Sequence, residues 1–232
     1  MRNARLVHAR FLTSSVRELT FDPGDDFSFV PGQWVSFGIP GASAGPITRA
    51  YSIASGPRND GLFQVAVTRI ESGPGSGFLH QLPVGQSISM SDAKGFFLLH
   101  EPRRPILMVA TGTGISPFRS MLEGFIASGR TLPKTTVLLG VRSEEDILYA
   151  QEFDRFRLSG HVAFVASLSR PTEDWIGLKG YVQDHVPRLV TDLGADCDVY
   201  VCGLNKMVKE VRATLKEKLG FDRDRIHTER YD

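Results

Sequence analysis

Thr111-Gly112-Thr113-Gly114-Ile115-Ser116-Pro117-Phe118 is the stretch that decides the fold, because it joins an apolar run at residues 106–110 to a helical pattern at 117–128. Pro117 suits the first turn of a helix, and Ser116 before it suits the cap position. The small residues leave room for a pyrophosphate over the helix N-terminus, where the dipole and the unpaired amides favour anions. The stretch predicts a strand, a nucleotide-binding turn and a helix; the alternative is a tight turn that binds nothing.

Strands and helices alternate through the second half of the sequence. Short apolar runs predict buried strands at residues 106–110, 136–139, 161–166 and 199–202. Helical patterns cover residues 117–128, 150–158, 182–189 and 205–219, and Gly220 suits a left-handed C-cap after the last of them. This alternation predicts a doubly wound parallel sheet of the α/β class.

The first half of the sequence has the shorter period of β-strands. Runs that alternate between apolar and polar residues, separated by Pro, Gly, Asp and Asn, predict strands at 6–13, 16–21, 33–39, 49–54, 62–69 and 87–91, with one helix at 76–81. Regular short strands of this kind predict a closed antiparallel β-barrel. Two prolines flank charged residues at 101–105, so we expect a β-barrel domain at 1–101 and an α/β domain at 102–232.

Composition limits the functional classes. The net charge of +1 is spread along 232 residues and gives no argument for nucleic acid as a partner. The two cysteines are too few for a [2Fe–2S] cluster, and no histidine spacing suggests a metal site. No secretion signal is visible and no apolar run is long enough to cross a bilayer, so we expect a soluble, cytoplasmic protein without a membrane partner.

The tetrapeptide Arg49-Ala50-Tyr51-Ser52 has the residue types that a flavin site needs. A flavin requires an aromatic wall, a hydrogen-bond partner near N5 and a cation for its phosphate. Alternation along a strand places Arg49 and Tyr51 on one face and Ser52 on the other. The alternative is an ordinary barrel strand with a surface arginine and a half-buried tyrosine.

A glycine-rich loop, Gly73-Pro74-Gly75-Ser76-Gly77, follows the strand that contains Val67. Glycines there let backbone amides approach a phosphate at the start of a helix. The alternative is a plain loop in which Ser76 serves as the helix N-cap, and both interpretations can hold together.

Two further segments suit the ends of a dinucleotide. Cys202-Gly203 and Met207 stand where a buried strand passes into an amphipathic helix, although a cysteine at a strand end is usually packing material. Ser169-Arg170 follows another strand, and an arginine there can bind a 2′-phosphate, whereas a carboxylate would favour the ribose diol of NADH. The alternative for this pair is a simple exposed turn.

In this order and spacing, the motifs resemble those of the ferredoxin–NADP reductase superfamily. The resemblance covers essentially the whole chain and includes the patterns Arg-x-Tyr-Ser, Gly-x-x-Ser, Gly-Thr-Gly-Ile-Ser-Pro-Phe and Cys-Gly-x-x-x-Met. Plant-type relatives end in Glu-x-Tyr, which Glu229 and Tyr231 match, but Asp232 stands one residue beyond the usual stop. The alternative for these last residues is a frayed, solvated terminus.

The resemblance implies roles for individual residues. Arg49 would pair with the flavin pyrophosphate, Tyr51 would pack on the isoalloxazine, and Ser52 would hydrogen-bond near N5. The family places the cysteine beside the reactive nicotinamide carbon, and the final tyrosine over the flavin face. The implied catalytic residues are Ser52, Cys202 and Glu229. The implied cofactor-binding residues are Arg49, Ala50, Tyr51, Ser52, Val67, Gly73, Gly75, Ser76, Thr111, Gly112, Thr113, Gly114, Ser169, Arg170, Lys179, Cys202, Gly203, Met207 and Tyr231.

The implied activity is hydride transfer from NADPH to bound FAD, followed by single-electron transfer to a protein acceptor. NADH and FMN are the alternative cofactors, and ferredoxin, flavodoxin or an oxygenase component are the candidate acceptors. Three other interpretations stay open. The chain can be a reductase of free flavin, an electron-transfer subunit of a larger oxygenase, hydrogenase or synthase complex, or a non-catalytic nucleotide-binding module.

Overall fold

The computed structural model describes residues 1–40, 47–158, 160 and 162–231. His161, at the start of the strand expected over 161–166, and Asp232 lie outside the described residues. Contacts between Cα atoms divide the chain into two units, Met1–Leu99 with Ser116–Gly129, and His100–Ile115 with Arg130–Asp232. Within the described residues, no helix is both long and apolar enough to span a membrane.

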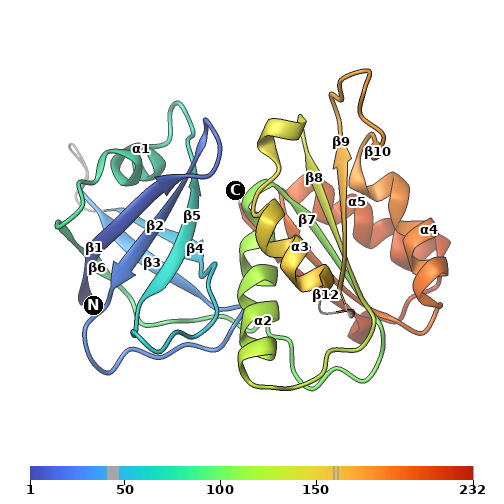
Figure 1. Cartoon of the computed structure of the whole chain (residues 1–232), viewed down its shortest axis with the longest axis horizontal. Helices are drawn as coiled ribbons and strands as arrows, with labels where there is room; N and C mark the ends of the chain where they lie inside the picture. The colour runs from blue at the N-terminus through green and yellow to red at the C-terminus, as the bar shows by residue number, and fades with distance from the viewer. Residues whose placement is uncertain (41–46, 159, 161, 232) are drawn as a thin grey trace. The chain divides into compact units, whose positions relative to one another are not determined.

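The first unit is built on an antiparallel sheet, which has six strands in the described residues and the order β4-β3-β6-β1-β2-β5 (Figure 1). The strands are β1 (Arg2–Phe11), β2 (Val16–Asp22), β3 (Trp34–Ile39), β4 (Ile47–Ser52), β5 (Phe63–Thr68) and β6 (Ser87–Met90). Ile53, directly after β4, forms an antiparallel bridge with Val65 of β5, so the two edge strands meet. The sheet therefore closes on itself, and the predicted antiparallel barrel is confirmed.

Helix α1 (Pro74–Gln81) follows β5. It begins two residues earlier than the sequence predicts, because Pro74 occupies its first turn and Gly73 is its N-cap. Its other end is held by Arg17 of β2, whose Nη1 donates to the carbonyl oxygens of Leu79 (3.0 Å) and His80 (2.8 Å). A cation at this position satisfies carbonyl groups that have no partner within the helix.

Helix α2 (Ser116–Ala127) belongs by its contacts to the first unit, although it follows the first strand of the α/β domain in the chain. Its Phe118 is fully buried and packs against Phe97, with 5.8 Å between ring centroids. The expectation that Ser116 caps this helix is wrong: Ser116 is its first residue, and its buried Oγ has no hydrogen-bond partner among the described residues.

The second unit is built on a parallel sheet, again of six strands in the described part of the chain, ordered β10-β9-β8-β7-β11-β12. The strands are β7 (Ile106–Thr111), β8 (Thr135–Val141), β9 (Val162–Leu168), β10 (Leu178–Lys179), β11 (Asp198–Gly203) and β12 (Ile226–Arg230). Every adjacent pair is parallel, so their carboxyl ends share one edge. This confirms the predicted doubly wound architecture.

Helices cover both sides of this sheet, with α3 (Ala150–Leu158) on one side and α4 (Val182–Leu193) and α5 (Asn205–Ala213) on the other (Figure 1). Short turns of helix complete the unit: η1 (Gly112–Ile115), η2 (Glu144–Asp146), η3 (Thr214–Lys218) and η4 (Arg223–Arg225). The helix expected over 205–219 is continuous but changes to π-helix in η3, and Gly220 has the left-handed φ of +68° that a C-cap requires. Strands β10 and β12 are not predicted from the sequence.

Candidate functional site

In the first unit, the side chains of Arg49 and Tyr51 meet the first turn of α1. A Cβ atom added to Gly75 would lie 2.8 Å from Arg49 Cγ and 3.4 Å from the Tyr51 hydroxyl. A glycine is therefore needed at this position for the strand and the helix to approach so closely. The residues form a cradle with an exposed guanidinium beside a helix N-terminus, which is the arrangement that binds phosphate.

Tyr51 has the surroundings of an aromatic wall. It is half-buried and packs against Phe37, with ring centroids 5.9 Å apart. Burial raises the pKa of the Tyr51 phenol, and the Arg49 charge offsets part of that rise. Ala50 is exposed and Ser52 is half-buried at the end of β4, opposite Trp34 in the strand register.

Ser76 orders the loop instead of capping the helix, so its expected alternative role as N-cap is wrong. Its buried Oγ accepts a hydrogen bond from Ile70 N (3.1 Å) and lies within bonding distance of Ile70 O and Gly73 O. The hydroxyl is thus occupied within the protein. The backbone amides of the first turn are the groups left for a phosphate.

Val67 lies in the barrel core. Its side chain is fully buried, and its carbonyl oxygen lies 2.8 Å from His80 Nε2. Its place in a cofactor site stays a prediction. The sequence pattern missed Arg69, whose Nη1 would lie 3.1 Å from a Cβ on Gly77 and is therefore close to the same helix.

In the second unit, the turns after β7 and β11 are in contact. A Cβ on Gly114 would collide with the carbonyl oxygen of Cys202, and a Cβ on Gly203 would collide with Thr111 Oγ1. Thr111 Oγ1 also accepts a hydrogen bond from Leu204 N at 3.3 Å. Gly112, by contrast, has a left-handed φ of +51° and no described atom within 4 Å of its added Cβ, so this part of the turn is open.

Tyr231 lies against these two turns. Its hydroxyl is buried beside Thr113 and Cys202, without a well-formed hydrogen bond to any described residue, and would lie 2.9 Å from a Cβ on Gly114. Burial raises its pKa well above the usual range. Its backbone NH donates to Gly203 O at 3.4 Å, so the chain end is ordered against β11 up to this residue.

Cys202 and Glu229 are directly opposite in the register of β11 and β12. Cys202 is fully buried, and burial together with the nearby Glu229 charge raises the pKa of its thiol well above the usual value. Met207, in the first turns of α5, is also buried in the core of this unit. Among the described residues both cysteines, Cys197 and Cys202, are free.

Three cationic residues lie at the carboxyl ends of β8, β9 and β10. Arg170 N donates to Arg142 O (2.8 Å), and Ser169 N donates to Val141 O (3.0 Å), so the two turns lie side by side. Arg142, Arg170 and Lys179 are all exposed, and Lys179 pairs with Leu168 in the strand register. Arg142 was missed by sequence reasoning, although its place directly after the β8 strand could have indicated it.

Comparison with known proteins agrees with this division. Residues 3–98 match the family described as oxidoreductase FAD-binding domain, and residues 108–213 match the oxidoreductase NAD-binding domain. Ferredoxin–NADP reductase B of Sorangium cellulosum (strain So ce56) is 43% identical over 99% of this chain and 97% of its own length.

More distant relatives are longer proteins or share the fold alone. The 2-halobenzoate 1,2-dioxygenase electron transfer component of Burkholderia cepacia is 34% identical over 87% of this chain but only 59% of its own length. The solved flavohem-like FAD/NAD binding domain of nitric oxide dioxygenase from Vibrio cholerae O1 biovar El Tor superposes with a TM-score of 0.86. It covers 99% of this chain and 98% of that domain at 23% identity, which supports the two-domain fold.

Proposed function

The chain belongs to the ferredoxin–NADP reductase family of oxidoreductases, with its FAD-binding and NAD-binding domains, and we propose that it oxidises NADPH and reduces a protein acceptor. The observation that carries this proposal is the cradle in which Arg49, Tyr51 and Gly75 meet at the start of α1. A bound FAD would supply the redox chemistry, as an acceptor of hydride from the nicotinamide and a donor of single electrons. The rest of the chemistry is orientation and electrostatics supplied by the protein.

The flavin domain is proposed to span 1–101 and the nucleotide domain 102–232, which the family matches over 3–98 and 108–213 support. In the first, Arg49 and the amides of the first turn of α1 would hold the pyrophosphate, with Arg69 as a second cation. Tyr51 would pack on the flavin ring, and Ser52 would donate a hydrogen bond near N5. The proposed flavin-binding residues in this domain are Arg49, Ala50, Tyr51, Ser52, Gly73, Gly75 and Ser76.

In the second domain, the turn after β7 would receive the dinucleotide pyrophosphate, because it is open at Gly112 and followed at once by a helix. Cys202 and Glu229 would line the nicotinamide end, with Gly203 and Met207 shaping the turn behind them. Since Cys202 is fully buried beside the Tyr231 hydroxyl, nicotinamide would reach it only after Tyr231 moves aside. The binding residues here are Thr111, Gly112, Thr113, Gly114, Cys202, Gly203, Met207 and Tyr231.

NADPH is the proposed donor, with NADH as the alternative. Arg142, Arg170 and Lys179 are exposed together at the carboxyl ends of the strands, where the adenosine ribose lies in doubly wound sheets. Guanidinium groups bind a phosphate through paired hydrogen bonds, and Ser169 adds a hydroxyl to the same turn. The Sorangium relative, named a ferredoxin–NADP reductase, supports the same choice.

Ferredoxin or flavodoxin is the proposed acceptor, in the cytoplasm, where the two free buried thiols would stay reduced. An oxygenase component is the second candidate, because the dioxygenase electron transfer component matches most of this chain.

The test is stopped-flow reduction of the purified flavoprotein with NADPH and NADH in parallel, followed by addition of each candidate acceptor. We expect faster flavin bleaching with NADPH and reoxidation by ferredoxin or flavodoxin. A Ser52→Ala variant should retain flavin and bleach slowly; bleaching at the normal rate would remove Ser52 from the mechanism. Turnover only with free flavin would replace the proposal by a flavin reductase.

A further inference from the structure

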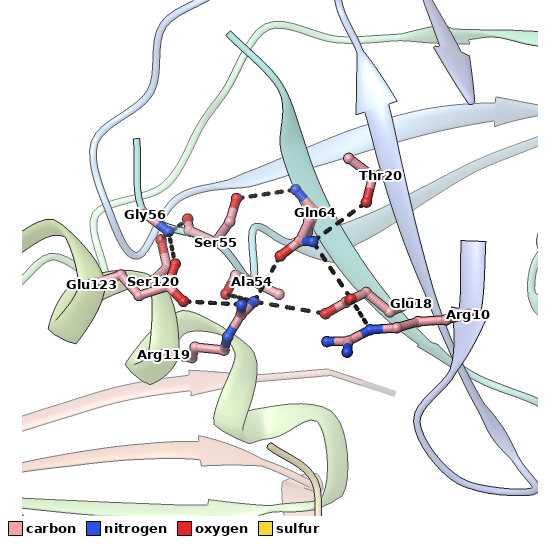
Figure 2. A network of polar contacts seen from close by, with 10 residues as sticks. All are labelled: Arg10, Glu18, Thr20, Ala54, Ser55, Gly56, Gln64, Arg119, Ser120 and Glu123. Atoms are coloured by element: carbon pink, nitrogen blue, oxygen red, sulfur yellow. Dashed lines mark hydrogen bonds and ion pairs between the residues drawn. The ribbon is translucent and has the colours of Figure 1, made fainter. Parts of the chain in front are cut away.

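Three side chains of helix α2 form hydrogen bonds with the backbone of residues 54–56, which lie shortly after strand β4. Arg119 Nη1 donates to Ala54 O at 2.9 Å, and Ser120 Oγ donates to Ser55 O at 2.6 Å. Glu123 Oε2 accepts from Gly56 N at 2.7 Å. Figure 2 shows the three side chains of one helix reaching this short segment, which starts two residues after Ser52.

The helix and the segment are packed too closely to shift along one another. A Cβ on Gly56 would lie 2.7 Å from Glu123 Cβ and 2.9 Å from Gly124 N. A Cβ on Gly124 would lie 2.6 Å from Pro31 Cγ on another side of the contact. Both glycines are therefore needed for the close approach.

Charged side chains, two of them buried, also stabilise the contact between α2 and the barrel. Arg119 and Glu18 have side chains only 8% and 1% exposed, with Arg119 Nη1 3.7 Å from Glu18 Oε2. Arg119 Nη2 binds Glu123 Oε1 at 2.9 Å, and its Nη1 also donates to the side-chain oxygen of Gln64 at 2.9 Å (Figure 2). Apolar residues could dock a helix here as tightly, whereas a planar guanidinium also fixes the direction of each bond.

We propose that Arg119 is a positioning residue for hydride transfer: it fixes residues 54–56, and through them β4, whose Arg49, Tyr51 and Ser52 hold the flavin. The same helix begins at Ser116, directly after the Gly112–Ile115 turn in the chain. The Arg119 guanidinium would therefore position β4, and it belongs to a helix that directly follows the Gly112–Ile115 turn in the chain. This inference rests on the proposed function.

The expected effect is on rate more than on affinity. Hydride transfer requires the reacting atoms in near-attack geometry, and a displacement of about 1 Å can cost on the order of a hundredfold in rate. Arg119→Lys keeps a positive charge near Glu18 and Glu123. A single ammonium cannot serve Ala54 O, Gln64 and Glu123 in the same planar arrangement. Arg188→Lys is the matched control, because Arg188 on α4 pairs with Asp192 at the same helical spacing but is 78% exposed.

The full-length flavin-loaded protein is measured in two ways. Hydrogen exchange of the Gly56 amide measures how firmly α2 holds residues 54–56, independently of catalysis. Stopped-flow reduction by NADPH gives the limiting bleaching rate and the NADPH dissociation constant separately. For Arg119→Lys we expect faster exchange at Gly56, a limiting rate lowered about tenfold, weaker nicotinamide–flavin charge-transfer absorbance, and a nearly unchanged dissociation constant. Ser120→Ala, which leaves every charge in place, should change the same quantities to a smaller extent.

Normal exchange and a normal limiting rate in Arg119→Lys would overturn the inference, as would an equal loss in Arg188→Lys. If Arg119→Lys does not fold, Ser120→Ala decides, and normal values for it would overturn the inference. Failure of the unmodified protein to be bleached by NADPH would instead overturn the proposed function, so the two failures are distinguishable.

Discussion

Cys202 is suited to lining a nicotinamide site as an uncharged thiol and not as a nucleophile. Burial and the adjacent Glu229 hold the pKa of its thiol well above the usual value, so the thiol stays uncharged at neutral pH. Only a thiolate is an effective nucleophile or metal ligand. Beside the Tyr231 hydroxyl, Cys202 would therefore contribute shape and a weakly polar surface at the end of β11.

Arg170 is the subject of the first prediction, because it is exposed and its backbone NH donates to Arg142 O, at the end of β8. Changing Arg170→Asp places a carboxylate where a 2′-phosphate would bind. We expect the affinity for NADPH to fall by about tenfold or more while that for NADH changes little. Steady-state and stopped-flow measurements with both dinucleotides check this result.

Arg188→Asp provides the control, since Arg188 is an exposed arginine on α4 in the same unit. It should leave both dinucleotides unaffected. Equal weakening of NADPH and NADH by Arg170→Asp would show that this turn does not recognise the 2′-phosphate.

At the scale of single residues, the sequence predicted the places of Arg49, Tyr51 and the turn at Gly112, because each lies in a short contiguous motif. It did not predict Arg69 or the pairing of Arg119 with Glu18. Arg119 and Glu18 lie far apart in the chain and meet only through the folded barrel, and Arg69 approaches Gly77 only once α1 has packed beside the end of β5. Local spacing carries no signal for such contacts.

Helix α1 is the element whose packing is most directly tied to the flavin cradle. An alanine at Gly75 would require Arg49 to move, since its Cγ would be 2.8 Å from the new Cβ. An alanine at Gly77 meets only the mobile end of Arg69, at 3.1 Å. Both changes favour a helix intrinsically by about 1 kcal/mol.

We therefore expect Gly75→Ala to lose flavin during purification or dialysis while Gly77→Ala retains it. The flavin content per chain, read from absorbance, checks this result. Equal retention in the two variants would contradict the close approach between β4 and α1.

The C-terminal end of α1 gives a pH-dependent prediction. Burial lowers the pKa of His80 below its usual 6.5, although the hydrogen bond to Val67 O opposes the shift. The unfolded chain then binds a proton more readily than the folded one. This contribution to stability is complete above the unfolded pKa and decreases as the pH falls through the folded pKa.

The measurement is urea unfolding of the native protein and of His80→Gln at about pH 8 and about pH 5. We expect the loss of stability on acidification to be smaller in the variant. Part of the loss should persist, because burial also lowers the pKa of His227. An identical loss in both proteins would contradict the assignment to His80.

At the scale of elements, the sequence predicted strands such as β5 and helix α3 because their periodicity is local. Strand β12 was not predicted, because Ile226-His227-Thr228-Glu229-Arg230 has no apolar pattern. The strand forms through parallel pairing with β11. The packing of α2 against the barrel was not predicted for a similar reason. Its burial depends on Gly32, Gly56 and Phe97, which no helical pattern indicates.

For the whole molecule, the contact pattern predicts that the barrel is incomplete at the domain boundary read from the sequence. A fragment of residues 1–101 lacks α2, so it leaves Glu18 without Arg119 and uncovers the surface at Gly56. Glu18 keeps its 2.7 Å ion pair with Arg10, so the larger cost is the exposure of apolar surface, such as Phe97, that Phe118 of α2 covers. We expect this fragment to lose cooperative thermal unfolding.

The matched control joins residues 1–99 to 116–129 through a flexible glycine–serine linker. It restores the unit that the contacts define and should unfold cooperatively. A fragment of residues 1–101 with the same melting curve as this control would show that α2 is not needed for the barrel.

Anaerobic stopped-flow mixing of the purified protein with NADPH shows whether bound flavin takes electrons from the nicotinamide and passes them on. We expect a yellow protein that releases FAD on denaturation, is bleached by NADPH in one exponential phase, and recovers its colour when ferredoxin or flavodoxin is added. A colourless protein, or a bound flavin that NADPH and NADH both fail to bleach, would contradict the proposed function.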